Sequence, residues 1–346
     1  MKYRTLEDCL VGRQNNFNLI RLLAALMVIY GHAAAVTGKG PADLFLSVVG
    51  FKFIGGVAVD VFFVVSGFLV ASSANSGMGA IYYVGSRLLR IYPALFVCVG
   101  LTVFVLGPTV TQAPDYWGAS TFRYLWVNAT AYGTEYFLPG VFQTLHDKAV
   151  NGSLWSLAVE VKMYWIVLVL YFVGALRRTY LFNLIFFSFL IVGFFAPEVP
   201  GQLFSHPSHL SVAMMFGLGT FCYVNRECIL ISPVWMLLLL FFGAAMHGTK
   251  AFAVAYSLLL AYGVFYVAFA RKLPWSEKIG DYSYGVYLYG WLAQQILLLL
   301  NPDMSNHMNA ILASCLALMC GVISWHLIEE PALALKDRLR RFKAAQ

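Results

Sequence analysis

Charged residues are unusually few in this 346-residue sequence. They make up 11% of the chain, whereas hydrophobic residues make up 60%. A soluble domain carries about a quarter charged residues. The deficit excludes an ordinary water-soluble fold and indicates a protein embedded in a lipid bilayer. The net charge of +7 does not indicate a nucleic-acid partner, because the basic residues are interleaved with long apolar blocks and form no groove for DNA.

Cysteine is also scarce, and no two cysteines form a C-x-x-C pair. The pattern predicts neither a disulfide framework nor a zinc site, and we interpret the thiols as reduced packing residues. His206 and His209, in "HPSH", have no third ligand beside them in the sequence, so no metal is expected. Neither a cleavable signal peptide nor an internal repeat is expected. The six cysteines are Cys9, Cys98, Cys222, Cys228, Cys315 and Cys320.

What the sequence has in abundance is apolar blocks. A bilayer core of ~30 Å requires roughly 20 apolar residues per helix. We therefore expect an all-α, polytopic membrane protein with about ten transmembrane helices, forming a single domain over residues 1–346. A long outer loop, about residues 108–153, follows the third block, and loops of this length are usually functional or form a lid. The blocks are residues 17–37, 51–74, 89–107, 154–174, 180–196, 209–224, 229–246, 251–270, 282–300 and 309–328.

The basic residues predict how these helices are oriented. If the N-terminus is cytoplasmic, sixteen of the 23 Lys and Arg residues lie on the cytoplasmic side and six lie outside, with Arg21 inside the first helix. The positive-inside rule then favours ten spans with both termini in the cytoplasm, because an odd number would remove this asymmetry. The cytoplasmic set is Lys2, Arg4, Arg13, Arg87, Arg90, Arg177, Arg178, Arg226, Arg271, Lys272, Lys278, Lys336, Arg338, Arg340, Arg341 and Lys343. The outer set is Lys39, Lys52, Arg123, Lys148, Lys162 and Lys250.

Two residues that are unfavourable inside a bilayer lie in the first apolar block, "NLIRLLAALMVIYGH". Arg21 and His32 are eleven positions apart, which is three helical turns plus ~20°, so both side chains face the same way. The rise separates them by ~16 Å along the helix axis. An arginine near mid-bilayer costs about 2.5–3.5 kcal/mol on insertion scales. A single histidine could serve only as an interhelical hydrogen-bonding residue, but the shared face favours a lined cavity.

Two carboxylates in other blocks are candidates for the same cavity. Asp60, in the second block, is expected at a depth similar to that of His32, where it could orient the imidazole and stabilise its protonated form. Its alternative role is to pair with an arginine for insertion alone. Glu160, near the start of the fourth block, is a candidate acid/base partner or ligand for an acceptor hydroxyl. It could equally pair with Lys162 or Arg123 without a catalytic purpose.

A pair of arginines opens the third block in "GSRLLRIYPAL". Arg87 and Arg90 are three positions apart, so they share a face, and we place them near a helix N-terminus. Two guanidinium groups at such a place suit phosphate. The alternative is that they only anchor the topology.

Taken together, these segments resemble the acyltransferase-3 family of integral membrane acyltransferases. The resemblance covers nearly the whole chain, and its six motifs occur in the family's order. They are Arg21-x10-His32, "VDVFFVVSGFL", "RLLRIYP" at Arg87–Pro93, "SLWSLAVE" ending at Glu160, "YSYGVYL" at 282–288 and "IEEP" at 328–331.

The resemblance implies an O-acyltransferase of the bacterial inner membrane. Such proteins move an acyl group, usually acetyl, from cytoplasmic acyl-CoA to a hydroxyl of an extracytoplasmic glycan. Acetyl-CoA would be the donor cosubstrate, and a polysaccharide, lipopolysaccharide or lipid-linked glycan would be the acceptor. By resemblance, His32 is the catalytic histidine with Arg21 as its companion, Arg87 and Arg90 hold the coenzyme A phosphates, and Glu160 is a functionally important carboxylate.

The sequence departs from the family pattern in two places. Gly290-Trp291 stands where the ninth-helix motif often continues to a histidine, and Glu160-Val161 replaces a double glutamate. An appended extracellular esterase-like domain is not expected, which makes this a stand-alone transferase.

We therefore hypothesise a passage in which the pantetheine arm of the donor runs past Arg21, so that the thioester reaches His32. The histidine would act as a base or as a transient acyl acceptor. A secondary transporter of a small solute is the main alternative, although no inverted repeat is visible in the sequence. A catalytically inactive partner of a polysaccharide assembly machine is a third reading.

Overall fold

A computed structural model describes residues 4–10, 15–40, 43–196, 198–204, 206–270, 280–337 and 340. The chain forms two compact units. The first comprises Met1–Arg21, Asp60–Gly79 and Lys162–Ile279, and the second comprises Leu22–Val59, Ala80–Val161 and Gly280–Gln346.

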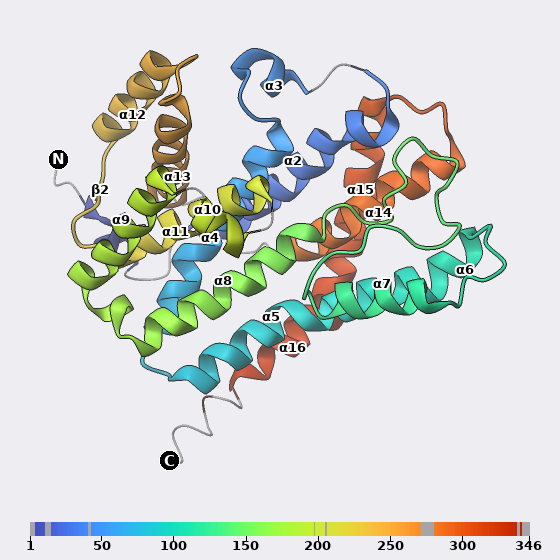
Figure 1. Ribbon diagram of the computed structural model, residues 1–346, viewed down its shortest axis with the longest axis horizontal. Coiled ribbons are helices and arrows are strands. Elements are labelled where there is room, and N and C mark those ends of the chain that lie inside the picture. The colour runs from blue at the N-terminus through green and yellow to red at the C-terminus, as the bar shows by residue number, and fades with distance from the viewer. Residues whose placement is uncertain are drawn as a thin grey trace. The chain divides into compact units, whose positions relative to one another are not determined.

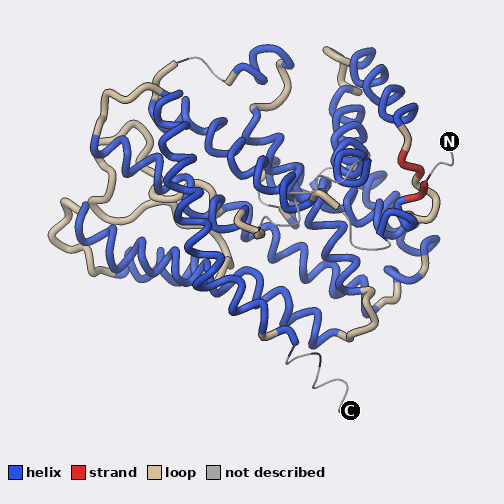
Figure 2. Tube along the Cα trace, turned by 180° about the vertical axis from the view of Figure 1, so that it is seen from behind, coloured by secondary structure: helices blue, strands red, loops and turns tan. Residues whose placement is uncertain are grey.

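The described elements of the first unit are helices and two short strands, which pair antiparallel with Arg4 opposite Ile231 and Thr5 opposite Leu230. These strands are the red segments of Figure 2. Its complete elements are β1 (Arg4–Thr5), α1 (Leu6–Leu10), the 3₁₀ turn η2 (Ala175–Arg177), α9 (Thr179–Phe195), α10 (Glu198–Leu203), α11 (Pro207–Val224), β2 (Leu230–Ile231), α12 (Pro233–Met246) and α13 (Phe252–Ala270). Parts of α2 (Phe17–Thr37), α4 (Ile54–Ala74) and α8 (Trp155–Phe172) also belong to it.

Small residues allow α4 and α11 to touch within this unit. A Cβ at Gly67 would lie 2.0 Å from the carbonyl oxygen of Phe216, and one at Gly219 would lie 2.1 Å from that of Val64. Backbones can approach this closely only where a side chain is absent, as is usual at contacts between membrane helices. The backbones of the two helices are therefore in direct contact at these glycines.

The second unit contains the remaining helices. Here α14 and α15 pack along their length, and α16 packs against α5, as Figure 1 shows. A Cβ at Gly285 of α14 would lie 2.8 Å from the Cα of Gly321 in α15, so this pair is also in backbone contact. The complete elements are α3 (Leu44–Val49), α5 (Ala80–Leu101), the π-helix η1 (Thr102–Leu106), α6 (Gly107–Val110), α7 (Ala119–Ala129), α14 (Ser283–Leu300), α15 (Asn306–Ser324), the π-helix η4 (Trp325–Glu329) and α16 (Glu330–Ala334).

The segment expected to be a long loop, residues 108–153, is ordered and contains α7. The side chain of Asn128 donates to the carbonyl oxygen of Glu135 at 2.9 Å, and Thr111 donates to that of Pro139 at 2.7 Å. These side-chain bonds supply partners for a backbone that lacks its own ladder. The segment is thus a folded part of the second unit.

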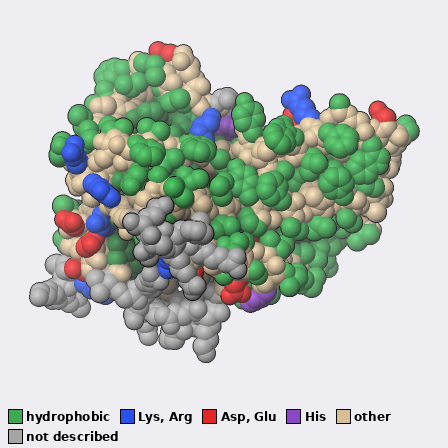
Figure 3. Space-filling view, turned by 90° about the horizontal axis from the view of Figure 1, so that it is seen from below, with side chains coloured by type: hydrophobic (Ala, Val, Ile, Leu, Met, Phe, Trp, Pro, Cys, Tyr) green, Lys and Arg blue, Asp and Glu red, His purple; other side chains and the backbone are tan. Residues whose placement is uncertain are grey.

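Among the residues that the structure describes, six helices are long and apolar enough to cross a membrane. They begin at Phe17, Ile54, Ala80, Trp155, Phe252 and Asn306, and two shorter apolar helices begin at Thr179 and Pro233. Hydrophobic side chains cover much of the face seen in Figure 3. Large exposed residues such as Phe194 (80% exposed) and Phe241 (75%) are expected where the surroundings are lipid.

Each of the ten predicted apolar blocks overlaps a helix, which confirms a multi-helix fold with very little strand. The count of ten spans and the cytoplasmic position of both termini stay predictions. Several residues behind that orientation lie outside the described residues: Lys2, Arg13, Arg271, Lys272, Lys278, Arg338, Arg341 and Lys343.

The predicted start of the third apolar block was wrong. The helix that contains this block, α5, begins at Ala80 and not near residue 89. Arg87 and Arg90 therefore lie in its second and third turns rather than beside its N-terminus. Gly85 does not interrupt the helix, because the cost of one helical glycine, about 1 kcal/mol, is small.

Candidate active site

His32 is held in one tautomer by its own helix. In α2, its Nδ1 lies 2.8 Å from the carbonyl oxygen of Val28, one turn earlier. A carbonyl oxygen can only accept, so Nδ1 donates the proton and Nε2 of the neutral ring carries the lone pair. Among the described residues no hydrogen bond reaches Nε2. The imidazole is thus fixed in the form that a general base or nucleophile requires.

Aromatic rings and glycines shape the space around this imidazole. The rings of Phe53 and Trp291 contact it edge-on, with centroids 5.1 and 5.2 Å away. Gly55 of α4 leaves room for it, because a Cβ there would lie 3.2 Å from both Cε1 and Nδ1 of His32. A Cβ at Gly31 would lie 2.4 Å from the backbone nitrogen of Gly55. The two helices therefore cross at backbone distance beside the histidine.

Trp291 connects His32 to the ordered segment 146–152. Its indole nitrogen donates to the carbonyl oxygen of Ala149 at 3.0 Å. The Gln295 side chain, fully buried on the same helix, donates to the carbonyl oxygens of Asp147 at 2.8 Å and Ala149 at 2.7 Å. A Cβ at Gly152 would lie 2.6 Å from the Trp291 ring. Trp291 stands near where a family histidine was expected, and here an indole contacts His32.

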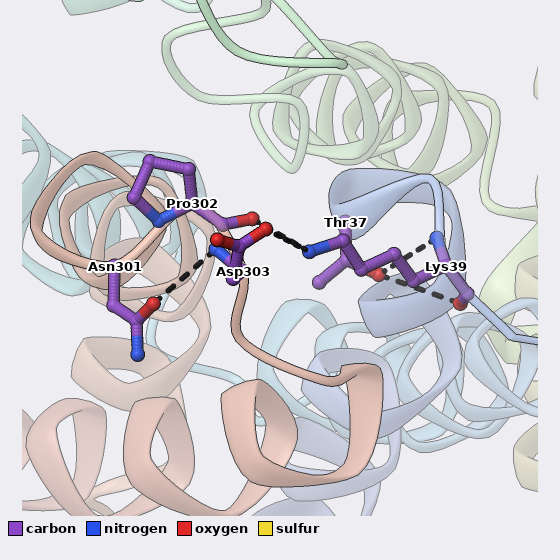
Figure 4. A network of polar contacts seen from close by, with 5 residues as sticks. All are labelled: Thr37, Lys39, Asn301, Pro302 and Asp303. Carbon is purple, nitrogen blue, oxygen red and sulfur yellow. Dashed lines mark hydrogen bonds and ion pairs between the residues drawn. The ribbon is translucent and has the colours of Figure 1, made fainter.

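The C-terminal end of α2 is fixed as well (Figure 4). The Lys39 ammonium donates to the carbonyl oxygen of Pro302 at 2.8 Å and lies 3.5 Å from a carboxylate oxygen of Asp303. The Thr37 hydroxyl accepts from the backbone N–H of Lys39 at 3.2 Å, closing the turn after the helix. These contacts tie α2 to the turn between α14 and α15, five to seven residues beyond His32.

Arg21 and Asp60, both predicted for the site, belong to the first unit. The Arg21 guanidinium lies 6.0 Å from the centroid of the Phe62 ring, at cation–π distance. Asp60 is fully buried, and its Oδ2 accepts from the hydroxyl of Tyr256 at 2.7 Å. The orientation of His32 by Asp60 stays a prediction, because His32 belongs to the second unit. The helical spacing of Arg21 and His32 stands, since α2 is continuous from Phe17 to Thr37.

Glu160 lies in the first turns of α8, partly buried, within electrostatic reach of Tyr284 and Tyr287 of α14. The Tyr287 hydroxyl is 2.6 Å from that of Ser156 and donates to the carbonyl oxygen of Ser153 at 2.9 Å.

The basic partners considered for Glu160 are engaged elsewhere. Arg123 pairs with Glu135 at 2.7 Å, and Lys162 donates to the carbonyl oxygen of Leu203 at 2.8 Å.

Arg90 has a partner that the sequence did not indicate. Its guanidinium pairs with Asp281 at 2.6 Å, and both side chains are largely buried. Ser283 donates to the other oxygen of the Asp281 carboxylate at 2.7 Å, and the Arg90 guanidinium lies 5.7 Å from the centroid of the Tyr284 ring. Arg87 donates to Ser86 at 3.4 Å. The only sequence signal for Asp281 was an acidic residue just before the tyrosine-rich run.

The fold and this histidine define a multi-helix membrane protein with a titratable group inside its apolar helices. The acyltransferase domain model of the acyltransferase-3 family matches residues 14–328, and the chain belongs to that family. It is 29% identical over 333 residues to a protein of Shigella phage Sf6 named O-acetyl transferase, covering 92% of this chain and 96% of that one. It is 26% identical to nodulation protein 10 of Rhizobium leguminosarum bv. viciae, covering 96% and 98% of the two chains. No solved structure matches.

Proposed function

We propose that this membrane acyltransferase moves an acetyl group from cytoplasmic acetyl-CoA to a hydroxyl of an extracytoplasmic glycan, in a bacterial inner membrane. The observation that carries the proposal is the fixed tautomer of His32, whose Nδ1 is bound to the Val28 carbonyl oxygen at 2.8 Å. Membership of the acyltransferase family supports the reaction class, and the O-acetyl transferase of phage Sf6 supports the acetyl group.

In the proposed reaction, Nε2 of His32 takes the proton of the acceptor hydroxyl while its oxygen attacks the thioester carbonyl. The carbon–sulfur bond then breaks, and the imidazolium returns the proton to the departing sulfur, so that coenzyme A leaves as a thiol and His32 is neutral again. The same lone pair could instead accept the acetyl group briefly and pass it to the hydroxyl. Both routes depend on Nε2, so both predict that the imidazole is essential.

The other residues are proposed to bind and orient. Arg87 and Arg90 would hold donor phosphates, since guanidinium groups suit phosphate oxygens. Arg21, on the same face of α2 as His32, would lie along the path of the pantetheine arm. Glu160 would receive the acceptor hydroxyl, and Asp60 would stabilise the protonated imidazole. No metal takes part in the proposed reaction.

The test is His32→Ala in isolated membranes supplied with labelled acetyl-CoA. We expect label transfer to glycan to fall by about a hundredfold or more, because general-base catalysis typically contributes at least that much. His307→Ala is the matched control, since this histidine is exposed and its ring centroid lies 6.5 Å from that of Tyr30. Undiminished transfer by folded His32→Ala protein would refute the proposal.

A further inference from the structure

Four cations gather where the chain past α16 meets the first turns of α5, all in the second unit. Arg87 and Arg90 come from α5, Lys336 and Arg340 come from beyond α16, and the charges of the three arginines act on the Lys336 ammonium. The Arg340 guanidinium donates to the hydroxyl of Tyr82 at 3.2 Å and lies 5.8 Å from the centroid of that ring, which places Arg340 against α5. The helices α16 and η4 pack on α5 just before it.

Two carboxylates near these cations, Asp281 and Asp337, have partners of their own. Asp281 gives one oxygen to Arg90 at 2.6 Å and the other to Ser283 at 2.7 Å. Asp337 lies 3.5 Å from Arg340. Among the described residues, no hydrogen bond or carboxylate within 4.0 Å serves the Lys336 ammonium, although its side chain is partly buried. A cation in such surroundings is stabilised when an anion binds.

The pKa of Lys336 reflects these surroundings. Burial, followed by the like charges of Arg87, Arg90 and Arg340, lowers it to about 8, and Asp281 opposes this change. Phosphate oxygens would oppose this lowering of the pKa, because they bring opposite charge and hydrogen bonds to the ammonium. The charged and titratable groups on the elements packed here are Tyr82, Tyr83, Arg87, Arg90, Asp281, His326, Glu329, Glu330, Asp337 and Arg340.

We propose that Lys336 is a third phosphate-binding cation of the donor site, acting with Arg87 and Arg90 on the phosphates of coenzyme A. This inference rests on the proposed function, because it assumes that those two arginines receive the donor. Coenzyme A carries a pyrophosphate and a ribose phosphate, so a site with two arginines and a lysine matches a ligand with several phosphate groups. A lysine is suited as a mobile point charge beside the more rigid guanidinium groups.

The inference predicts that donor binding depends on pH. The ammonium is charged below a pKa of about 8 and neutral above it. Coenzyme A should therefore bind most tightly below about pH 8 and lose affinity as the pH rises through that value. Replacing Lys336 with arginine keeps the charge at high pH, and replacing it with glutamine removes the charge at every pH.

The experiment is calorimetric titration of coenzyme A into the full-length protein in nanodiscs of neutral phosphatidylcholine, at about pH 7 and about pH 9. We expect Lys336→Gln to weaken binding about tenfold at the lower pH, a typical effect of one charge-assisted hydrogen bond, and to have little effect at the higher pH. Lys336→Arg should bind equally well at both. Lys250→Gln, an exposed lysine of the other unit, is the matched control.

Three results would overturn the inference, and they differ in whether the proposed function fails with it. If the unaltered protein binds no coenzyme A, the proposed function fails together with it. If coenzyme A binds and Arg87→Ala abolishes binding while Lys336→Gln does not change it, only the role of Lys336 fails. If Lys336→Gln reduces retention of phosphatidylglycerol in mixed nanodiscs but leaves coenzyme A binding unchanged, the phosphate belongs to a lipid headgroup instead.

Discussion

At the residue scale, His32 is surrounded by two aromatic rings and one backbone hydrogen bond, and the Asp147 carboxylate lies within electrostatic reach of the imidazole. Phe53 and Trp291 contact the ring edge-on, and the Val28 carbonyl oxygen binds Nδ1. This combination fixes the ring without occupying Nε2. In the proposed reaction, an imidazole held this way would need no reorientation to act as the base, which is the benefit of preorganised catalytic groups.

Gly55 is the residue whose replacement tests this fixation most directly. A Cβ at position 55 would lie 2.5 Å from the Phe53 ring and 3.2 Å from two atoms of the imidazole. We expect Gly55→Ala to displace His32 and to lower the acetyl-transfer rate by about tenfold or more, since small misplacements of catalytic groups are costly. The rate is measured in membranes with labelled acetyl-CoA.

Gly100→Ala provides the control for Gly55→Ala. Gly100 lies inside a helix of the same unit, and a Cβ there would meet nothing within 4 Å. We expect this variant to keep its full transfer rate. Equal rates for the two alanine variants would contradict a tightly fitted imidazole.

The residues that could be predicted at this scale are polar residues whose insertion into a membrane helix costs free energy. Arg21 and His32 were visible because a cation and an imidazole interrupt an apolar helix. Asp281 and Trp291 were not, since their partners lie far away in sequence: Arg90 is 191 positions from Asp281, and Ala149 is 142 positions from Trp291. Hydropathy and spacing carry no information on which distant side chains meet.

At the scale of elements, apolar runs were sufficient to predict where helices lie, but not all of their ends. The first block matches α2 at both ends, from Phe17 to Thr37. In contrast, α5 extends nine residues before the predicted start, because the tyrosines and arginines of its first turns interrupt the apolar run without interrupting the helix. The helix α7 was missed since its polar residues resemble those of a loop.

The contact between α4 and α11 leads to a prediction of stability. A Cβ at Gly67 would lie 2.0 Å from the carbonyl oxygen of Phe216, and backbone atoms cannot move aside as a side-chain end can. We expect Gly67→Ala to lower the free energy of unfolding by about 1–3 kcal/mol or more. The change is measured as a lower melting temperature of the detergent-solubilised protein.

Gly263→Ala is the appropriate comparison for this contact. A Cβ at Gly263 would lie 3.6 Å from the end of the Met236 side chain, an ordinary van der Waals distance. We expect little change in melting temperature for this variant. If Gly67→Ala melted at the same temperature as Gly263→Ala, α4 and α11 would not be packed at backbone distance.

At the scale of the whole molecule, the distribution of basic residues makes a prediction about topology that the helices alone do not. Sixteen of the 23 basic residues fall on one side when the predicted spans are counted from a cytoplasmic N-terminus. The cytoplasmic side of a membrane retains short basic loops during insertion. Donor and acceptor in the proposed reaction lie on opposite sides of the bilayer, so this orientation also decides which end of α2 faces each substrate.

Alkaline phosphatase fusions measure that orientation, because the enzyme is active only outside the cytoplasm. We expect a fusion after Gln346 to be inactive and an insertion after Gly133, within the predicted outer segment, to be active. With Gly133 outside, His32 at the C-terminal part of α2 faces the glycan side and Arg21 faces the coenzyme A side, as the transfer requires. The opposite pattern of activities would place Arg87, Arg90 and Lys336 away from cytoplasmic acetyl-CoA, and the proposed direction of transfer would be wrong.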